Sequence, residues 1–224
     1  MVADDSSHLN AGQRTNPIVA SAVSSVRVAT PSDIEGIIDI FTSAFFEDPL
    51  WGPVFPDVTR RATQADAFWR QFVTSALRYP WTFVTERGQS AATWLPPGSD
   101  EFTAEEEDSF ERFLVAIADQ QIADNILAIL ELFAESRPSE PHYYLSLLGT
   151  HKDHRGHGSG MALLRENLAR IDALGAPAYL ESTNPANNQR YMSVGFRPHG
   201  SFTIPSGHTV TTMWRPANSP NFQR

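Results

Sequence analysis

A glycine-rich turn is the part of this sequence with the clearest chemical potential. It reads Arg155-Gly156-His157-Gly158-Ser159-Gly160, and it stands between an apolar stretch at residues 142–149 and a segment with apolar residues three and four apart. Glycine lacks a Cβ atom, so such a turn bends sharply and can bring several backbone N–H groups close to a ligand. A helix that starts there adds partial positive charge. The pattern predicts a phosphate or pyrophosphate site.

Two common phosphate-binding motifs do not fit this turn. A P-loop has Lys and Ser or Thr directly after its last glycine, whereas Met161 and Ala162 follow Gly160. A dinucleotide-binding motif needs the frame G-x-G-x-x-G, which is broken after Gly158. Glu181 does lie about 20 residues further on, as a ribose-binding acid would, but too little chain follows the turn for the other strands of a doubly wound sheet.

A second motif follows the turn. It consists of Asn184-Pro185-Ala186-Asn187 and then Arg190-Tyr191-Met192-Ser193-Val194-Gly195-Phe196. Together with the R-x-x-G-x-G turn at a helix start, it resembles the GNAT superfamily of acetyl-CoA-dependent N-acetyltransferases. The run at 177–185 is most similar to the antibiotic-modifying branch that includes puromycin N-acetyltransferase. The strong resemblance covers residues 142–214; the N-terminal third agrees in strand–helix order and in residues 45–50.

The resemblance implies acetyl-CoA as co-substrate and gives its binding residues by position. In this family the strand before the turn splays from its neighbour, and the pantetheine arm lies in the gap against the backbone of Leu148, Gly149 and Thr150. The pyrophosphate is expected to take backbone N–H groups from the turn, with the Arg155 side chain available for pairing. The turn residues concerned are Arg155, Gly156, His157, Gly158, Ser159 and Gly160. Asn184 and Asn187 match positions at the pantetheine end and the substrate side, and Tyr191 matches the tyrosine that faces the thioester sulfur.

The chemistry of amine acetylation requires a base and an acid. An alkylammonium is only roughly 0.1 % neutral near pH 7.4, so a proton must leave before the nitrogen attacks. Tyr191 is the candidate acid for the departing thiolate. Many relatives place a carboxylate on the splayed strand, but residues 143–148 contain none. Glu181 on the next strand is therefore the candidate base, acting through a water, or else a residue bonded to nearby backbone; His142 is a weaker option.

Three histidines are spaced by three residues, at His151, His154 and His157. On a helix this spacing would line one face and suggest a metal. They fall instead in the loop before the predicted helix, without cysteine and with only Asp153 nearby. We expect no metal site.

Hydrophobic patterning predicts the elements that position these residues. The expected strands cover residues 26–30, 81–85, 91–95, 142–149, 178–181, 196–203 and 208–214, and the expected helices cover about 30–48, 59–79, two segments between 100 and 138, 160–175 and 186–193. The predicted fold is α/β, a single GNAT-like domain at residues 26–216 with a central mixed sheet of six or seven strands, splayed around the coenzyme and flanked by helices. Residues 1–25 are expected to be a disordered leader and 217–224 a C-terminal tail.

Composition narrows the classes of function. The chain has 224 residues, and 17 Lys+Arg against 26 Asp+Glu give a formal net charge of −9, which argues against nucleic acid or an anionic membrane as partner. The absence of cysteine excludes disulfides, thiolate metal sites and a cysteine nucleophile. Without a secretory signal or an apolar run of membrane-spanning length, we expect a cytoplasmic protein. Seven of the twelve residues from Asp100 to Glu111 are acidic, which indicates either a solvated first helical turn or a rim that attracts a cationic substrate.

The leading hypothesis is acetylation of an amine on a small molecule, such as an antibiotic-like or other toxic amine. Acetylation of a protein N-terminus or lysine is the alternative within enzymes, and the acidic segment would suit basic peptides. A non-catalytic acyl-CoA-binding module is a third reading, which the missing strand carboxylate favours. A pocket closed by the 100–138 helices would favour a small molecule, and an open trough would favour a peptide. A monomer or a homodimer is expected.

Overall fold

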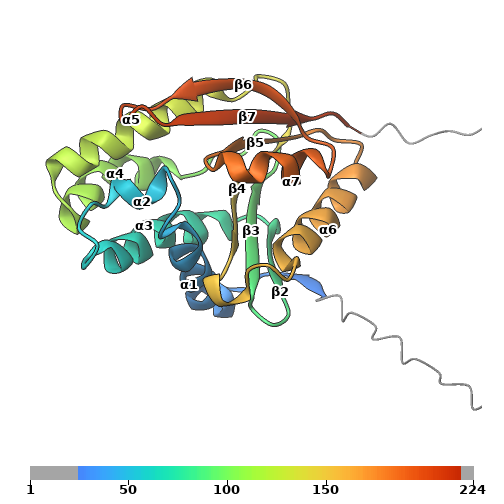
Figure 1. The fold of residues 1–224 in the computed structure, drawn as a ribbon, viewed down its shortest axis with the longest axis horizontal. Helices are drawn as coiled ribbons and strands as arrows, with labels where there is room; N and C mark the ends of the chain where they lie inside the picture. Colours follow the sequence, from blue (N-terminus) through green and yellow to red (C-terminus); the bar gives the residue numbers. More distant parts are fainter. Residues whose placement is uncertain (1–24, 218–224) are drawn as a thin grey trace, which may run out of the picture.

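A seven-stranded mixed sheet runs through residues 25–217, the part of the chain that the computed structural model describes, in the order β1-β2-β3-β4-β5-β7-β6 (Figure 1). Neighbouring strands are antiparallel, except that β4 and β5 are parallel. The strands are β1 (Val26–Val28), β2 (Thr82–Thr85), β3 (Ser90–Leu95), β4 (Tyr143–Thr150), β5 (Ala178–Ser182), β6 (Arg197–Thr203) and β7 (Thr209–Arg215). The α/β class and the mixed sheet are confirmed. The predicted leader and tail fall almost entirely outside the described range.

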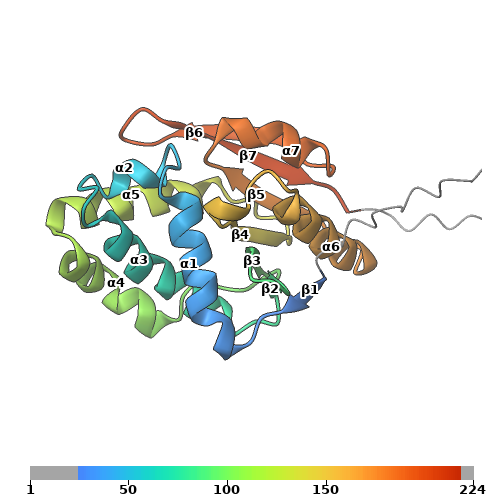
Figure 2. The ribbon, with the colours of Figure 1, turned by 60° about the horizontal axis from the view of Figure 1, so that its bottom comes forward.

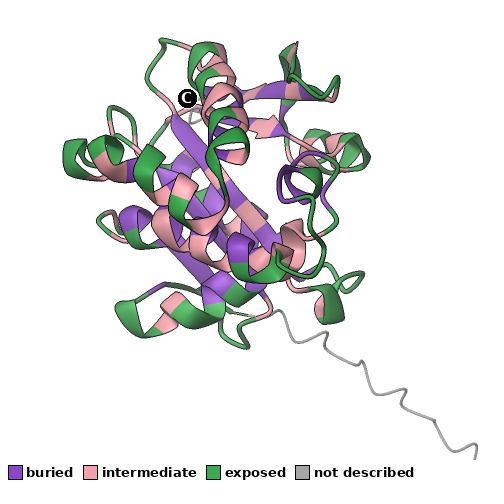
Figure 3. Cartoon of the chain, turned by 90° about the vertical axis from the view of Figure 1, so that its left-hand side faces the viewer, coloured by how far each residue is buried: buried purple, intermediate pink, exposed green. Residues whose placement is uncertain are grey.

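Helices cover both faces of this sheet. They are α1 (Ile34–Phe45), α2 (Trp51–Val54), α3 (Arg61–Ala76), α4 (Ala104–Ile117), α5 (Gln120–Ser136), α6 (Ser159–Ala173) and α7 (Asn188–Met192), with 3₁₀ turns at 31–33, 152–154 and 185–187. Helices α1 and α3 pack on β3, and α1 also packs on β4, whereas α6 packs on β2, β3 and β4 from the other side (Figure 2). Figure 3 shows the buried strands between helices whose outer surfaces are exposed.

The two helices between residues 100 and 138 begin at well-defined caps. The Thr103 hydroxyl accepts the backbone N–H of Glu106, and the Glu106 carboxylate accepts the backbone N–H of Thr103, which forms a capping box at the start of α4. Asp119 accepts the N–H of Ile122 and starts α5. Their apolar sides join the core cluster that also contains the buried faces of α1 and α3. These helices therefore close one side of the fold.

Strands β4 and β5 diverge after a short contact. Their register contains two pairs, Tyr143 with Ala178 and Tyr144 with Tyr179. Beyond Tyr144, β4 continues to Thr150 and pairs with β3. The structure thus has the splay that the sequence led us to expect, and the gap between the two strands opens toward the glycine-rich turn. No helix among residues 25–217 combines the length and apolarity needed to cross a membrane.

Candidate active site

The glycine-rich turn links β4 to α6 through two left-handed residues. Gly156 and Gly158 have φ values of +82° and +79°, and Gly158 is the N-cap of α6. A Cβ atom built on either glycine would meet no atom within 4 Å, so both face open space. The backbone of this turn is therefore accessible at the N-terminus of a fifteen-residue helix, where N–H groups favour an anion.

Gly160 has a different task from the one that the sequence indicated. A Cβ atom at Gly160 would lie 2.5 Å from the Thr150 hydroxyl oxygen, so its lack of a side chain lets α6 approach β4. The Thr150 hydroxyl in turn bonds the Ser90 hydroxyl at 2.9 Å, and Ser90 bonds that of Ser159 at 2.8 Å. This chain of hydroxyls joins β3, β4 and the first turn of α6. A side chain at Gly160 would therefore collide with the Thr150 side chain on β4.

A cavity of about 530 Å³ runs from this turn along the end of β4. Its lining includes eleven of the twelve predicted coenzyme-binding residues: Leu148, Gly149, Thr150, Arg155, Gly156, Gly158, Ser159, Gly160, Asn184, Asn187 and Tyr191. His157 is exposed and does not line it. The Arg155 guanidinium donates to the Ala44 carbonyl oxygen at 2.7 Å, so this side chain is partly engaged at the end of α1. We call this cavity the turn groove.

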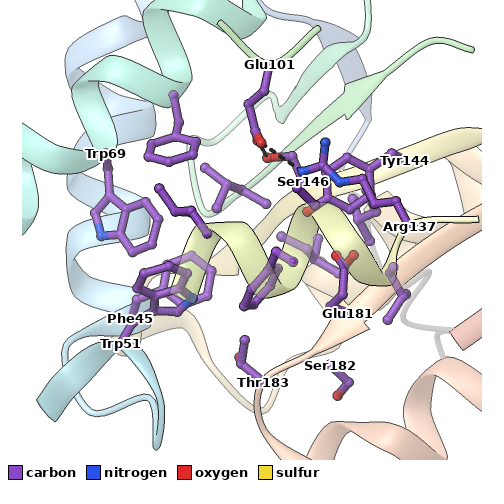
Figure 4. A pocket seen from close by; sticks show the side chains of 18 of the residues that line it. Phe45, Trp51, Trp69, Glu101, Arg137, Tyr144, Ser146, Glu181, Ser182 and Thr183 are labelled. Atoms are coloured by element: carbon purple, nitrogen blue, oxygen red, sulfur yellow. Dashed lines mark hydrogen bonds and ion pairs between the residues drawn. The ribbon is translucent and has the colours of Figure 1, made fainter. Parts of the chain in front are cut away.

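A second cavity, of about 520 Å³, lies in the gap beside β4 and β5 under α4 and α5. We call it the acceptor pocket (Figure 4). Aromatic side chains supply much of its wall, among them Phe45, Trp51, Trp69, Phe72, Phe110 and Phe133. Its charged lining residues are Asp48, Asp100, Glu101, Glu107, Glu111, Glu181 and one base, Arg137. Both cavities share six lining residues, which are Phe45, Asp48, Leu148, Asn184, Asn187 and Tyr191.

Glu181, the predicted base, lies on β5 and points into the acceptor pocket (Figure 4). Its Oε1 atom is buried and accepts no hydrogen bond from the described residues, so the alternative of a carboxylate bonded to nearby backbone finds no support. Burial raises the pKa of Glu181 to about 7, against the lowering effects of the Arg137 charge and the Tyr144 and Tyr179 hydroxyls. The carboxyl group therefore exchanges a proton near neutral pH.

Tyr191, the predicted acid, lies on α7 at the junction of the two cavities. Burial, together with the nearby Asp48 charge, raises the pKa of Tyr191 to about 12. Its ring packs edge-on against Phe196 at 6.2 Å between centroids. The phenol is thus protonated throughout the neutral range, as a proton donor must be.

The structure adds Asp48, which sequence reasoning did not single out. Its Oδ1 accepts the N–H groups of Leu50 and Trp51 at 2.9 and 3.1 Å and so starts α2, while Oδ2 accepts the Thr183 hydroxyl at 2.9 Å. Asp48 thereby ties α2 to the end of β5 and lines both cavities. The only sequence signal was its place in the run at 45–50, which agrees with the resemblance.

Glu101, Arg137 and Ser146 form a second polar group that sequence reasoning missed. They come from the loop before α4, the end of α5 and the middle of β4, and all three line the acceptor pocket. The Glu101 carboxylate accepts hydrogen bonds from the Ser146 hydroxyl and, at 2.9 Å, from the Arg137 guanidinium. Strand β4 has no carboxylate of its own here, so a loop residue brings one to it.

The histidines lie outside the acceptor pocket. His142 contacts the Glu140 carbonyl oxygen through Nδ1 at 2.6 Å and packs against Tyr179 and Trp214. His151 is the N-cap of the 3₁₀ turn that ends at His154, and the two ring centroids lie 5.9 Å apart. Residues 25–217 contain no group of three or more histidine or acidic side chains placed to hold a metal ion.

Comparison with known proteins adds family evidence to this geometry. A profile of the acetyltransferase (GNAT) family matches residues 70–196. Among solved structures, a histone acetyltransferase and related acetyltransferase from Corynebacterium glutamicum is 23 % identical, with TM-score 0.62 over 88 % of this chain and 97 % of that one. A mosquito arylalkylamine N-acetyltransferase-like protein is 15 % identical, with TM-score 0.60 over 85 % and 98 %. An agmatine N-acetyltransferase is 16 % identical, with TM-score 0.52 over 85 % and 97 %. At these identities the structures establish the fold alone.

Proposed function

The chain belongs to the acetyltransferase (GNAT) family, whose enzymes use acetyl-CoA, and we propose that it acetylates an amine on a small molecule. One observation carries this proposal: the turn groove and the acceptor pocket meet at a shared wall that contains Tyr191. A ligand held in each cavity would bring its reactive end to that wall. This arrangement suits transfer of a group between two substrates.

Acetyl-CoA supplies an acetyl thioester, and the turn groove has the features that its binding needs. The Gly156–Gly158 turn offers exposed backbone N–H groups at the start of α6 for the pyrophosphate. Leu148, Gly149 and Thr150 offer the end of the splayed strand to the pantetheine arm, and Asn184 and Asn187 line the groove near the junction. We assign no pyrophosphate contact to the side chain of His157, which does not line the groove.

Glu181 and Tyr191 have complementary protonation states for the reaction. With a pKa of about 7, Glu181 is partly ionised at neutral pH and is basic enough to take a proton from a bound ammonium, directly or through a water. Tyr191 keeps its proton and can donate a hydrogen bond to the departing sulfur. Backbone N–H groups of β4 beyond its contact with β5 are available to the carbonyl oxygen as negative charge develops.

The lining of the acceptor pocket supports an amine with an apolar body. Aromatic walls bury apolar substrate surface, and six carboxylates against one guanidinium favour a cation. Helices α4 and α5 contribute Phe110, Leu127, Leu130 and Phe133 to this wall. The two helices therefore cover the pocket, and they would have to move away before a peptide could enter it. This favours a small molecule over a protein substrate.

The finer resemblance, to puromycin N-acetyltransferase-type enzymes, makes an aminonucleoside-like or other toxic amine one candidate substrate. The relatives named above as arylalkylamine and agmatine acetyltransferases support amines as a class. A cytoplasmic location and a monomeric or dimeric state stay predictions from the sequence.

The test combines thermal shift with a free-thiol assay. Acetyl-CoA should raise the melting temperature, and thiol release should require an amine from a panel of arylalkylamines, aliphatic diamines, puromycin and short basic peptides. Release with a peptide and with no small amine would overturn the small-molecule proposal. Release with no amine at all, despite acetyl-CoA binding, would favour a module that binds without catalysis.

A further inference from the structure

One guanidinium lies between two carboxylates in the wall of the acceptor pocket. Arg137, directly after α5, stacks on the Tyr144 ring at 3.9 Å from the guanidinium carbon to the ring centroid. Its ion pair is with Glu101, at 2.9 Å, and within residues 25–217 no ion pair closer than 4.0 Å joins it to Glu181. Figure 4 shows Arg137 between the labelled side chains of Glu101 and Glu181. Arg137 thus makes its ion pair with Glu101, and it acts on Glu181 through its charge without a direct bond.

Glu101 is firmly held in the position that makes this possible. Its carboxylate bonds the Ser146 hydroxyl on β4 as well as Arg137. Its backbone carbonyl oxygen accepts the buried Ser75 hydroxyl at 2.6 Å. The preceding carbonyl, that of Asp100, accepts Arg78 at 3.1 Å and the Tyr79 hydroxyl at 3.2 Å. Contacts from the end of α3 therefore fix this loop, and the Glu101 side chain keeps 16 % of its surface exposed.

Arg137 has unused capacity to bind a second carboxylate. Its Nε atom is buried without a hydrogen-bond partner, and so is Oε1 of Glu181. Each of these atoms would gain from a new partner, because a buried polar group left unpaired costs free energy. The guanidinium is held in its present place by the bond to Glu101 and by its stacking on Tyr144, and of these two contacts the bond to Glu101 is the one with a carboxylate.

From this arrangement we infer that Glu101 is a positioning residue, which holds Arg137 in an ion pair of its own and so leaves the Glu181 carboxylate free to accept the substrate's proton. The inference rests on the proposed function, in which Glu181 is the base. Without Glu101, Arg137 would turn to Glu181 and bind it in its ionised form. A carboxylate held in this way is a weaker base, because a guanidinium within about 4–6 Å lowers a carboxyl pKa by roughly 1–3 units.

The charged and titratable groups around Glu181 come from several elements. Arg137 after α5 and the hydroxyls of Tyr144 on β4 and Tyr179 on β5 favour its ionised form, whereas Glu101 opposes it. Asp48 and Tyr191 line the same pocket on the side of the turn groove. Across the ladder on β7 its neighbour is the uncharged Thr212. Arg137 is thus the cation whose position decides the balance.

The experiment measures kcat against pH, at saturating acetyl-CoA and amine, for the full chain and its variants. The wild type should show an acid limb near pH 7 that Glu181→Gln removes. Glu101→Gln should move this limb down by about one pH unit. Arg137→Met should move it up, since the cation is gone. In the Arg137→Met background, adding Glu101→Gln should lower the limb by less than Glu101→Gln does in the wild type, because only the direct repulsion between Glu101 and Glu181 is then removed.

A matched control is Glu105→Gln. Glu105 lies in the first turn of α4, is exposed and does not line the pocket, so its loss removes the same charge without touching Arg137. The limb should stay where it is. Ser146→Ala, which loosens Glu101 but keeps every charge, should shift the limb down by less than Glu101→Gln does, and it serves as the measurement should Glu101→Gln fail to fold.

The outcomes separate the two proposals. If the wild type has no limb near pH 7, or if Glu181→Gln retains it, the assignment of Glu181 as base is wrong. If Glu181 does give the limb but Glu101→Gln, or Ser146→Ala in its place, leaves it unmoved, the positioning role of Glu101 is wrong. The positioning role would also be refuted if Glu101→Gln lowered the limb as much in the Arg137→Met background as it does in the wild type. Glu101 would then act on Glu181 by its own charge and not through Arg137.

Discussion

Replacing Tyr191 with phenylalanine isolates the role of one hydroxyl group. The ring would keep its edge-on packing against Phe196, and the backbone of Tyr191 would keep its contacts with Val194 and Phe196. Only the phenolic proton is lost. If Tyr191 assists the departing sulfur, turnover must fall while binding and folding stay nearly unchanged.

The pKa of Tyr191 sets the size of the effect. A thiol titrates near 8.5, so complete proton transfer from a phenol of pKa about 12 to a thiolate would be uphill by about 3.5 pKa units, or roughly 5 kcal/mol. Tyr191 is therefore expected to donate a hydrogen bond to the sulfur as its charge grows, without giving up its proton fully. A hydrogen bond to a charged group contributes about 1.5–3 kcal/mol. Tyr191→Phe should thus lower kcat by about 10- to 150-fold.

The assay is thiol release under saturating conditions, alongside calorimetric titration of acetyl-CoA and thermal unfolding. Tyr143→Phe is the matched control, because Tyr143 lies on β4 against Trp81 and lines neither cavity. The acetyl-CoA dissociation constant and the melting temperature should stay within error in both variants. Full turnover in Tyr191→Phe would refute the reasoning, and a large loss of stability would show that the hydroxyl serves the fold instead.

Three further predictions concern other sites. Glu181→Gln should lose turnover and yet gain up to about 3 kcal/mol of stability at pH 8, measured by denaturant unfolding. The gain arises because the pKa of Glu181 is raised to about 7 in the folded chain, so ionised Glu181 destabilises the fold. It should vanish below about pH 4.5, where Glu181 is protonated in both the folded and the unfolded chain. Gly158→Leu should abolish acetyl-CoA binding, measured by titration, and should cost only about 1–2 kcal/mol of backbone strain from φ +79°. Gly160→Ala should instead lower the melting temperature because its Cβ atom collides with Thr150, and adding Thr150→Ala should partly restore it. Equal effects of the two glycine variants on both binding and melting temperature would contradict the geometry. Arg215→Met breaks an ion pair with Asp172, at 2.7 Å, that lies outside both cavities. It should lower the free energy of unfolding by about 2–3 kcal/mol, less than the loss of a fully buried pair would, because 25 % of the Asp172 side chain is exposed. The affinity for acetyl-CoA should not change.

Periodicity predicted the long elements because their burial follows from the sequence alone. Helix α1 carries buried residues at 37, 38, 40 and 41, and the two helices between 100 and 138 start at caps that the sequence spells out. Helix α2 was missed for a physical reason. It is a single turn, Trp51–Val54, that includes Gly52 and Pro53, and it starts because Asp48 accepts two backbone N–H groups. A side chain that caps so short a helix leaves no periodic signal.

The site divides between contiguous and assembled parts. The turn residues 155–160 are adjacent in sequence, so their spacing alone predicted a phosphate site beside a helix, and the groove lies there. Arg137 lies 36 residues after Glu101 in the sequence, and Ser146 lies 45 residues after it. The three side chains meet only when α5 has packed and β4 has paired in the sheet. No local pattern distinguishes Glu101 from its acidic neighbours.

The acidic segment at 100–111 contains more than one function, which explains why its composition could not be interpreted as a whole. Glu106 closes a capping box and pairs with Arg78 at 2.7 Å, so it serves the fold. Glu107 and Glu111 are exposed and line the acceptor pocket, where they would attract a cation. Glu101 turns inward to β4 and Arg137. Which role each residue has depends on how α4 and the loop before it are oriented. The Ser75 hydroxyl on α3 helps to fix that orientation, because it donates to the Glu101 carbonyl oxygen. The acidic composition of the segment is visible in the sequence, but the role of each carboxylate is determined by its tertiary contacts.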